Sequence, residues 1–381
     1  MRIWVQQCLR LLNFVFQDIF LEICYAYFKE GIAYLNIMMC DYFLKVIRTF
    51  LSIGMLSLLM SLYPLKVEKN HLVSNGKNII LRGFSIADPY KIRNKDKIEV
   101  SFIINKIVEL GGNVIRVPIR PDLWQTIPNF FELYIDEIVD ECLKNDIYCV
   151  LDWHAIGNPI KNQTRMKESF IEKNGCKYYR YDSNIEIAYK FWAESSQRYV
   201  KKKNVIFEVF NEPAPGEKDI QKMELSALYW KEWKLCLEKL IEIIRINSNN
   251  LILISPVRWA YNLSNVAEYP LIGKNIAYSV HPYPIHTDWQ ENFEKVVGKF
   301  ALVVTEWGFM EKTDQDFLRS NSVQYGVPIL NYMEENHISW IAWCFDKSWD
   351  PKIVNSWEDR DYSNWGKFIT QRLGEILRKP L

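Results

Sequence analysis

Short apolar runs alternate with amphipathic segments along the chain from about Lys66 onward. Eight of these runs are rich in β-branched and aromatic residues and have the length of strands. They cover Asn78–Phe84, Asn113–Pro118, Ile147–His154, Val205–Phe210, Leu251–Ser255, Ile276–His281, Ala301–Glu306 and Ser339–Cys344. Because they are apolar almost without interruption, they predict strands that are buried on both faces, as in a parallel sheet.

The segments between these runs have the spacing of amphipathic helices. The predicted helices are Val100–Leu110, Phe131–Leu143, Glu186–Val200, Leu225–Ile246, Asp314–Glu335 and Lys367–Leu377. Eight strands that alternate with such crossover segments predict an α/β protein, a (β/α)8 TIM barrel over residues 67–381. The longest connection runs from His154 to Asn204, so we expect an extended third loop.

Residues 1–66 form an N-terminal extension of a different character, rich in Leu, Ile, Phe, Tyr and Met. Residues 49–65 carry no charge and follow two basic residues. This pattern is typical of a secretory signal or an uncleaved membrane anchor, so we expect a secreted or membrane-anchored extracellular protein. Two alternatives are an over-long gene start, with Met38 or Met39 as the natural beginning, and a helical extension that packs on the barrel.

The amino-acid composition limits the possible classes of function but does not identify one. The 381 residues are 49% hydrophobic and 24% charged, which is ordinary for a globular protein. The formal charge of +1 gives no electrostatic reason to expect a nucleic acid partner. An aromatic content of 14% suits a carbohydrate cleft, although core packing explains any single aromatic residue equally well. The eight cysteines contain no C-x-x-C pair, and we expect mostly buried thiols and no metal site.

Two of the predicted strands end at a glutamate. Val205–Phe210 is followed by Asn211, Glu212 and Pro213, and the proline cannot continue a ladder of hydrogen bonds. Glu306 ends the seventh run in the same way. A parallel barrel gathers the C-terminal ends of its strands at one mouth. We therefore expect Glu212 and Glu306 to form a facing carboxyl pair of the kind that cleaves glycosidic bonds.

Other polar and aromatic residues interrupt the apolar runs at or near the same strand ends. They are Arg116, His154, Asn211, His281, Tyr283 and Trp343. Each alone has an ordinary explanation, such as a structural ion pair, a core histidine or a core tryptophan. Their common position at one end of a barrel makes them candidate substrate-binding residues. Weaker candidates for sugar stacking are Trp124, Trp259 and Trp307, and Trp349 is a candidate for shaping a further subsite.

Six sequence blocks, in this order, resemble glycoside hydrolase family 5, the cellulase family of barrel glycosidases. The blocks are Gly-Gly-Asn-Val-Ile-Arg116-Val-Pro, Leu-Asp-Trp-His154, Val-Phe-Asn211-Glu212-Pro, Val-His281-Pro-Tyr283, Thr-Glu306-Trp-Gly and Trp-Ile-Ala-Trp343. Asn-Glu-Pro alone is a weak signal, whereas six blocks in the family's order are a strong one. The resemblance covers about residues 78 to 350 and leaves residues 1–66 outside.

The resemblance implies roles for the residues of these blocks. Glu212 would be the general acid/base and Glu306 the nucleophile of a retaining mechanism, which places the two carboxyls roughly 5–5.5 Å apart. Arg116 would orient Glu306 and keep it ionised. Asn211 would hold the 2-hydroxyl of the sugar.

The resemblance also implies a sugar-binding cleft. His154 and His281 would line the site of the reacting sugar, Tyr283 would contact the nucleophile, and Trp343 would form a stacking floor. Such a mechanism requires no metal and no cofactor, and we find no cofactor motif. We expect a monomer whose partner is a polysaccharide or oligosaccharide.

The substrate predicted from this reading is a β-linked polysaccharide, most simply a β-1,4-glucan cleaved by an endoglucanase. β-Mannan, xylan, xyloglucan and β-1,3-glucan remain alternatives, because the contacts that decide among them lie on loops. A carbohydrate-binding barrel without catalysis is the alternative of another class. The presence of both glutamates together with Arg116 and Asn211 favours the enzyme.

Overall fold

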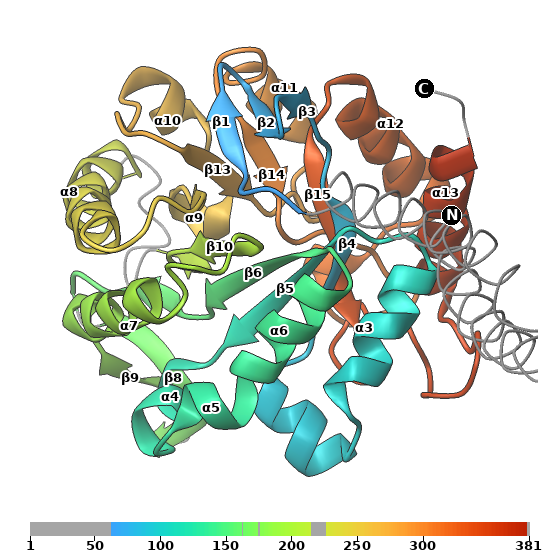
Figure 1. Ribbon diagram of the computed structural model, residues 1–381, viewed down its shortest axis with the longest axis horizontal. Coiled ribbons are helices and arrows are strands. Elements are labelled where there is room, and N and C mark those ends of the chain that lie inside the picture. The colour runs from blue at the N-terminus through green and yellow to red at the C-terminus, as the bar shows by residue number, and fades with distance from the viewer. Residues whose placement is uncertain (1–61, 162, 174–175, 215–225, 379–381) are drawn as a thin grey trace, which may run out of the picture. The chain divides into compact units, whose positions relative to one another are not determined.

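The computed structural model describes residues 62–161, 163–173, 176–214 and 226–378. Eight parallel strands form a closed barrel in these residues, as Figure 1 shows. In barrel order they are β4 (Arg82–Ile86), β5 (Val114–Ile119), β6 (Tyr148–Trp153), β10 (Val205–Glu208), β12 (Ile252–Ile254), β13 (Ile276–Val280), β14 (Leu302–Val304) and β15 (Ser339–Phe345). β15 pairs with β4 and closes the ring, so the predicted (β/α)8 barrel is confirmed.

Helices connect the strands around the outside of the barrel (Figure 1). The main ones are α3 (Val100–Glu109), α5 (Phe130–Tyr134), α6 (Asp136–Lys144), α7 (Ile185–Arg198), α8 (Ser226–Arg245), α12 (Val327–Glu335) and α13 (Asn364–Arg378). Shorter segments are η1 (Lys91–Asp96), α4 (Pro121–Thr126), α9 (Val257–Ala260), α10 (Ser264–Glu268), α11 (Trp289–Glu294), η4 (Asp316–Leu318) and η5 (Ser322–Gly326).

Two predicted helices differ from the observed ones. The segment 131–143 contains two helices, α5 and α6, that meet at Ile135. The prediction of one helix over 314–335 was wrong for residues 314–321, where only the short 3-10 helix η4 occurs. There the side chain of Asn321 accepts hydrogen bonds from Val323 N and Gln324 N and so starts the helical stretch that continues into α12.

A three-stranded antiparallel sheet precedes the barrel and was not predicted. It consists of β1 (Lys66–Glu68), β2 (His71–Ser74) and β3 (Lys77–Asn78). Asn75 and Gly76 both have positive φ, as the two central residues of an Asn-Gly hairpin turn require. The predicted first strand was therefore wrong at its start, because Asn78 belongs to this hairpin and the barrel strand begins at Arg82.

Two layers of side chains fill the inside of the barrel. The lower layer is apolar, and the upper layer, nearer the C-terminal ends of the strands, is mostly polar. Side chains alternate between the two faces of a strand, so residues two positions apart share the interior. The lower layer contains Gly83, Val114, Val150, Ile206, Leu253, Ala277, Val303 and Ile341, and most of these pack in one cluster with Leu65 and Leu72. Two positions further along each strand are Ser85, Arg116, Asp152, Glu208, Ser255, Ser279, Thr305 and Trp343. The polar layer faces the mouth of the barrel and supplies the base of the site.

The third connection is extended, as predicted, and contains a sheet of its own. Its strands are β7 (Ile156–Asn158), β8 (Gln163–Lys173) and β9 (Cys176–Ser183), joined by β11 (Glu212–Pro213). β11 pairs in parallel with β7, and Glu212 N donates to the carbonyl of Ala155 at 3.0 Å. The extended connection therefore fixes the backbone that carries Glu212.

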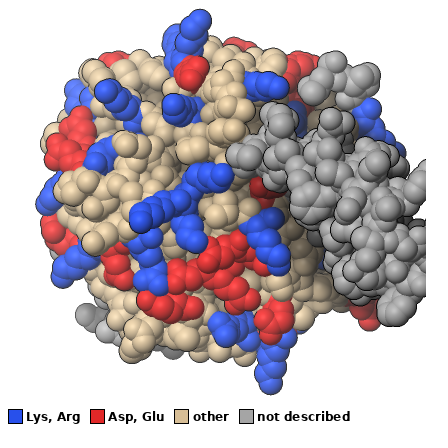
Figure 2. Space-filling model, viewed as in Figure 1, with Lys and Arg blue, Asp and Glu red and all other residues tan. Residues whose placement is uncertain are grey.

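The signal or anchor expected at residues 49–65 falls mostly on positions 1–61, which lie outside the described residues. The boundary between residues 66 and 67 stays a prediction. Within the described ranges, no helix combines the length and apolarity needed to cross a bilayer. Among the cysteines in these ranges, Cys142, Cys149 and Cys344 are buried and Cys236 is partly buried. Basic and acidic side chains lie interspersed on the face shown in Figure 2, in keeping with the small net charge.

Candidate active site

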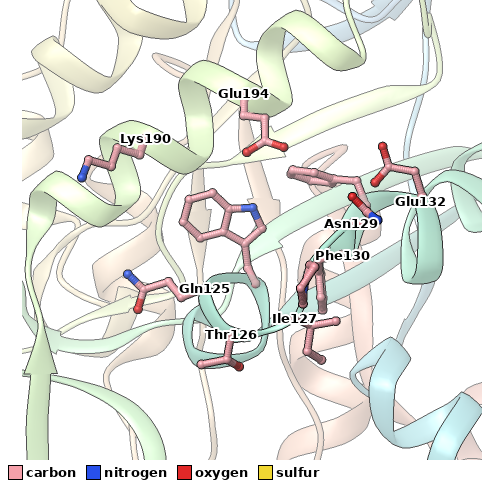
Figure 3. Close-up of a pocket in the computed structure, with 11 residues that line it drawn as sticks. Gln125, Thr126, Ile127, Asn129, Phe130, Glu132, Lys190 and Glu194 are labelled. Atoms are coloured by element: carbon pink, nitrogen blue, oxygen red, sulfur yellow. The ribbon is translucent and has the colours of Figure 1, made fainter.

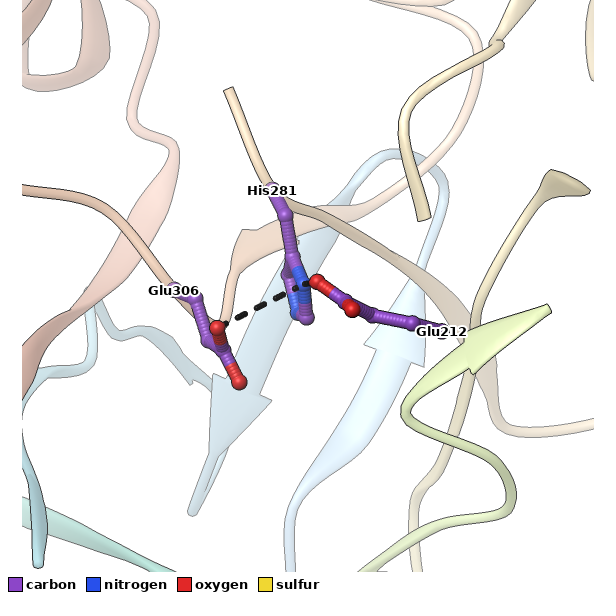
Figure 4. Close-up of side chains that lie close together, drawn as sticks. All are labelled: Glu212, His281 and Glu306. Carbon is purple, nitrogen blue, oxygen red and sulfur yellow. Dashed lines mark hydrogen bonds and ion pairs between the residues drawn. The ribbon is translucent and has the colours of Figure 1, made fainter. Parts of the chain in front are cut away.

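The structure brings Glu212, His281 and Glu306 together at the mouth of the barrel (Figure 4). Glu212 lies on β11, His281 directly follows β13, and Glu306 lies two residues beyond β14. One carboxylate oxygen of each glutamate and a ring nitrogen of His281 all lie within 4.8 Å of one another. The two carboxyls therefore face each other at a separation close to that of retaining glycosidases.

Arg116 is the buried centre of the site and is fully excluded from solvent. Its guanidinium binds Glu306 Oε1 at 2.7 Å and Asn211 Oδ1 at 2.7 Å. It also binds Glu208 Oε2 at 2.5 Å and Asp152 Oδ2 at 2.9 Å. Burial alone would lower the pKa of Arg116, but the three carboxylates outweigh it and raise the pKa well above its usual value. The site therefore contains a permanent cation against Glu306.

Two of these partners, Asp152 and Glu208, were missed by the sequence analysis. Each lies inside an apolar run that predicts a strand, and each follows an inward apolar residue by two positions. Burial raises the pKa of Asp152 to about 7, and the charge of Glu212 adds to that rise while Arg116 opposes it. The same oxygen of Asp152, Oδ2, also lies 2.6 Å from Nδ1 of His154. Asp152 and Glu208 thus hold the arginine and, through it, the nucleophile candidate.

His281 connects Glu212 to the polar layer below. Its Nδ1 lies 3.1 Å from Glu212 Oε1, and its Nε2 lies 3.0 Å from Thr305 Oγ1. The Thr305 hydroxyl in turn donates to Glu208 Oε1 at 2.7 Å. Burial lowers the pKa of His281 to about 4, and Arg116 also lowers it while Glu306 opposes, so the ring is neutral near neutral pH. Thr305 was not predicted as a site residue.

Glu306 receives a second hydrogen bond from Tyr283, whose hydroxyl lies 2.9 Å from Oε2. Burial raises the pKa of Tyr283 well above its usual value, and the charge of Glu306 adds to this shift. Tyr283 therefore stays a hydrogen-bond donor at any working pH. Arg116 therefore donates to one oxygen of Glu306 and Tyr283 donates to the other.

An aromatic surface adjoins the carboxyl pair. The rings of His154 and Trp343 are nearly parallel, with centroids 5.5 Å apart. Trp349 lies beside both, 6.1 Å from His154 and 5.6 Å from Trp343. The Arg116 guanidinium lies 5.8 Å from the Trp343 ring. Burial lowers the pKa of His154 to about 4, so this surface is uncharged and suits the apolar face of a sugar ring.

The remaining tryptophan candidates lie in different environments. Trp307 is fully buried between Trp340 and Trp365, so its interpretation as a stacking residue was wrong. Trp259 is half-buried in a left-handed turn at the end of β12, with φ of 54°. Trp124 packs edge-on against Phe191 and lines a separate pocket.

That separate pocket has a volume of about 500 Å³ and lies between α4, α5 and α7 (Figure 3). Its labelled polar side chains include Gln125, Asn129, Glu132 and Lys190. Apart from the weaker candidate Trp124, none of the predicted catalytic or substrate-binding residues lines it. The facing carboxyls, not this pocket, therefore define the candidate active site.

Three donor groups as close as those of Glu212, His281 and Glu306 could in principle hold a metal ion. Glu306 is, however, already bound by Arg116 and Tyr283, and a metal ion at the same oxygens would face the positive charge of Arg116. The donor set fits a hydrogen-bonded carboxyl pair better than a metal centre.

Facing carboxyls at the C-terminal mouth of a (β/α)8 barrel are the arrangement of the barrel glycosidases. The family model for cellulase, glycosyl hydrolase family 5, matches residues 72–348. The chain therefore belongs to glycoside hydrolase family 5, and it is a glycoside hydrolase.

Several relatives carry cellulase names. The chain is 26% identical over 298 residues to the cellulase CelDZ1 of a Thermoanaerobacterium species, over 71% of this chain and 70% of that protein. It is 27% identical over 326 residues to an endoglucanase of Clostridium saccharobutylicum, over 81% of this chain and 65% of that protein. The native crystal structure of the β-glucanase SdGluc5_26A from Saccharophagus degradans superposes with a TM-score of 0.72 and 27% identity. That match covers 83% of this chain and 94% of that one.

Proposed function

We propose that the protein is a retaining endo-β-1,4-glucanase that cleaves its substrate by double displacement. Glu306 is the nucleophile and Glu212 the general acid/base. The observation that carries this assignment is the asymmetry of the two carboxyls. Glu306 accepts hydrogen bonds from Arg116 and Tyr283, which stabilise a carboxylate, whereas Glu212 contacts a neutral imidazole.

The hydrogen bonds around His281 support a protonated Glu212. Thr305 has one hydroxyl proton and donates it to Glu208, so Nε2 of His281 must supply the proton in its own contact with Thr305. A neutral imidazole that carries its proton on Nε2 has a bare Nδ1. That nitrogen can only accept in its 3.1 Å contact with Glu212, which must therefore be the donor. A carboxylic acid that donates in this way is ready to protonate a leaving group.

In the first step, the Glu306 carboxylate attacks the anomeric carbon while Glu212 gives its proton to the glycosidic oxygen. The bond to the leaving sugar breaks, and a glycosyl ester forms on Glu306. In the second step, Glu212 removes a proton from water as the water attacks the same carbon and releases Glu306. Arg116 and Tyr283 stabilise the carboxylate before attack and again when it leaves. Asn211, held by Arg116, faces the 2-hydroxyl of the sugar.

The β-1,4-glucan assignment rests on the relatives and on the aromatic surface. The matched proteins are named cellulase and endoglucanase, and the similar β-glucanase has also been solved in complex with cellotetraose. His154, Trp343 and Trp349 offer a flat surface to successive glucose rings. β-Mannan, xylan, xyloglucan and β-1,3-glucan are the alternative substrates, and of these the mannan and xylan classes are tested beside glucan.

Hydrolysis by the full chain tests the proposal. Carboxymethyl-cellulose, barley mixed-linkage glucan, glucomannan and xylan are compared with the wild type, Glu212→Gln and Glu306→Ala. Release of reducing ends from a glucan that both substitutions abolish is the expected result. Activity on mannan or xylan alone would keep the mechanism and change the substrate. A folded wild type that binds glucan without cleaving any of these polymers would make the protein a non-catalytic carbohydrate-binding barrel.

For its location, we propose that the protein is secreted or anchored outside the cell through the apolar segment 49–65, and that the barrel acts as a monomer. The support is the sequence pattern of that segment and the polymeric substrate, which cannot enter a cell intact. N-terminal sequencing of the mature protein tests the first part, because cleavage after this segment indicates a signal peptide and an intact segment an anchor.

A further inference from the structure

A buried ion pair joins the first and the last βα-connections of the barrel. Lys91, in η1 after β4, places its Nζ 2.6 Å from Asp346 Oδ2 and 2.5 Å from Asp96 Oδ2. Asp346 follows β15, and its side chain is fully buried. Burial alone would raise the pKa of Asp346, but the hydrogen bonds from Lys91 and Ser348 and the charge of Lys91 together outweigh burial and lower the pKa, so the pair is ionised. None of the catalytic roles proposed above uses this pair.

The second oxygen of Asp346 organises the turn that carries Trp349. Asp346 Oδ1 accepts hydrogen bonds from Ser348 N at 2.7 Å, Ser348 Oγ at 2.9 Å and Trp349 N at 2.9 Å. One carboxylate thus faces Lys91 with one oxygen and the turn with the other. Since both oxygens are bonded, the orientation of the carboxylate fixes the backbone at Trp349.

Trp349 is half-buried and extends the aromatic surface of the site. Its ring is inclined by 22° to Trp343 and by 21° to His154. Trp343 is the member of this surface that approaches Arg116. A sugar unit stacked on Trp349 would therefore be a neighbour of the unit that stacks on Trp343.

We propose that Lys91 is a positioning residue for a glucose-binding subsite formed by Trp349. Through Asp346, it holds the indole nearly parallel to Trp343, so that a further glucose unit of a β-1,4-glucan chain stacks there. The inference rests on the proposed glucanase function and assigns a task to a residue that does not touch substrate. Removal of Lys91 leaves a buried carboxylate without its cation, so Asp346 binds a proton or a water molecule instead. Its hydrogen bonds to Ser348 and Trp349 then weaken.

The test compares Lys91→Met with a matched control, Arg82→Met, in the full chain. Arg82 lies at the start of β4, the strand that precedes η1, and forms an equally short ion pair with Glu334, whose oxygen is 2.5 Å away. Both substitutions are expected to lower the melting temperature. Only Lys91→Met is expected to raise KM for cellohexaose, by roughly five- to tenfold, the size of one aromatic contact, with kcat nearly unchanged. Lys91→Arg should restore most of the affinity.

A double variant separates positioning from general destabilisation. In a Trp349→Ala background, Lys91→Met should change KM no further, because the ring that it positions is gone. The proposal is overturned if Lys91→Met leaves KM at the wild-type value, as Arg82→Met does, or if its full effect persists without Trp349.

The same proteins keep this test distinct from that of the glucanase function. A wild type that cleaves no glucan contradicts the proposed function, and cellohexaose affinity measured by calorimetry then reports on Lys91 in place of KM. A wild type that neither cleaves nor binds the oligosaccharide overturns both proposals.

Discussion

The hydroxyl of Thr305 lies 3.0 Å from Nε2 of His281, and this contact decides which ring nitrogen carries the proton. Because the same hydroxyl donates to Glu208, His281 is left with Nε2–H and an accepting Nδ1 toward Glu212. Buried Thr305 thereby favours the protonated form of Glu212, the proposed general acid/base. A substitution at Thr305 should therefore change the pH dependence of catalysis, and this effect requires no direct contact between Thr305 and substrate.

Thr305→Val is expected to shift the basic limb of the kcat/KM profile to lower pH. Without an acceptor for Nε2–H, the imidazole places its proton on Nδ1 and donates to Glu212, which then gives up its own proton more easily. Thr305→Ser keeps the hydroxyl and serves as the control with an unshifted profile. Identical basic limbs in the valine variant and the wild type would show that His281 does not depend on Thr305.

Arg116→Lys should lower kcat by roughly 10²–10³-fold, the size of the loss when one preorganised charge-stabilising donor is removed. A lysine cannot reproduce the fork that binds Glu306, Asn211 and two further carboxylates at once. Because Asp152 and Glu208 are left poorly paired in the interior, the variant should also lose about 3–5 kcal/mol of stability. Steady-state kinetics and chemical denaturation measure the two effects. If Arg116→Lys keeps the wild-type kcat, Arg116 does not assist Glu306 in catalysis.

Tyr283→Phe should lower kcat roughly 10–100-fold with little change in stability, because a hydrogen bond to an ionised group is lost at Glu306. Tyr325→Phe is the matched control, since Tyr325 is also buried but donates to the backbone carbonyl of Pro282. The control should change the melting temperature and leave kcat near the wild-type value. Equal kcat losses in both variants would point to a general packing effect.

The free energy of unfolding should fall as the pH drops from about 6.5 to about 4. Burial lowers the pKa of His154, His281 and His286 to about 4 in the folded protein, whereas an unfolded histidine titrates near 6.5. Between these values the unfolded chain binds more protons, so stability rises with pH, and the expected difference is on the order of 5 kcal/mol. Asp152, whose pKa is raised to about 7 from about 3.9 in an unfolded chain, opposes this trend across the range.

His286→Gln isolates one contribution to that pH dependence, because His286 stacks on Tyr261 and lies outside the carboxyl pair. Urea denaturation at pH 7 and pH 4.5 should show a loss reduced by roughly a third in this variant. A free energy of unfolding that is flat between these pH values would contradict the neutral, buried state of the histidines.

The barrel strands could be predicted from the sequence because strands buried on both faces leave long apolar runs. The apolar character of these runs also made part of the site difficult to recognise from the sequence. Asp152 and Glu208 interrupt such runs by a single residue, and only the two-residue period of a strand shows that they point into the barrel with Arg116. Thr305 is uncharged and precedes Glu306, so nothing in its local sequence marked it.

Other features depend on contacts between distant segments. Lys91 and Asp346 are 255 positions apart and meet only because β15 closes the barrel against β4. The extra sheet of the third connection, which fixes Glu212, likewise follows from pairing between β7 and β11. The Asn75-Gly76 pair is a recognised hairpin-turn signal, but it stands directly before an apolar run that gives the stronger strand signal.

The stereochemistry of cleavage tests the central claim most directly. Proton NMR of the products formed by the full chain from cellohexaose, recorded before mutarotation, gives the configuration of the new anomeric centre. Facing carboxyls with oxygens within 4.8 Å and a nucleophilic Glu306 predict that the β-anomer forms first. Initial formation of the α-anomer would mean that water attacks directly, and would contradict the assignment of Glu306 as the nucleophile.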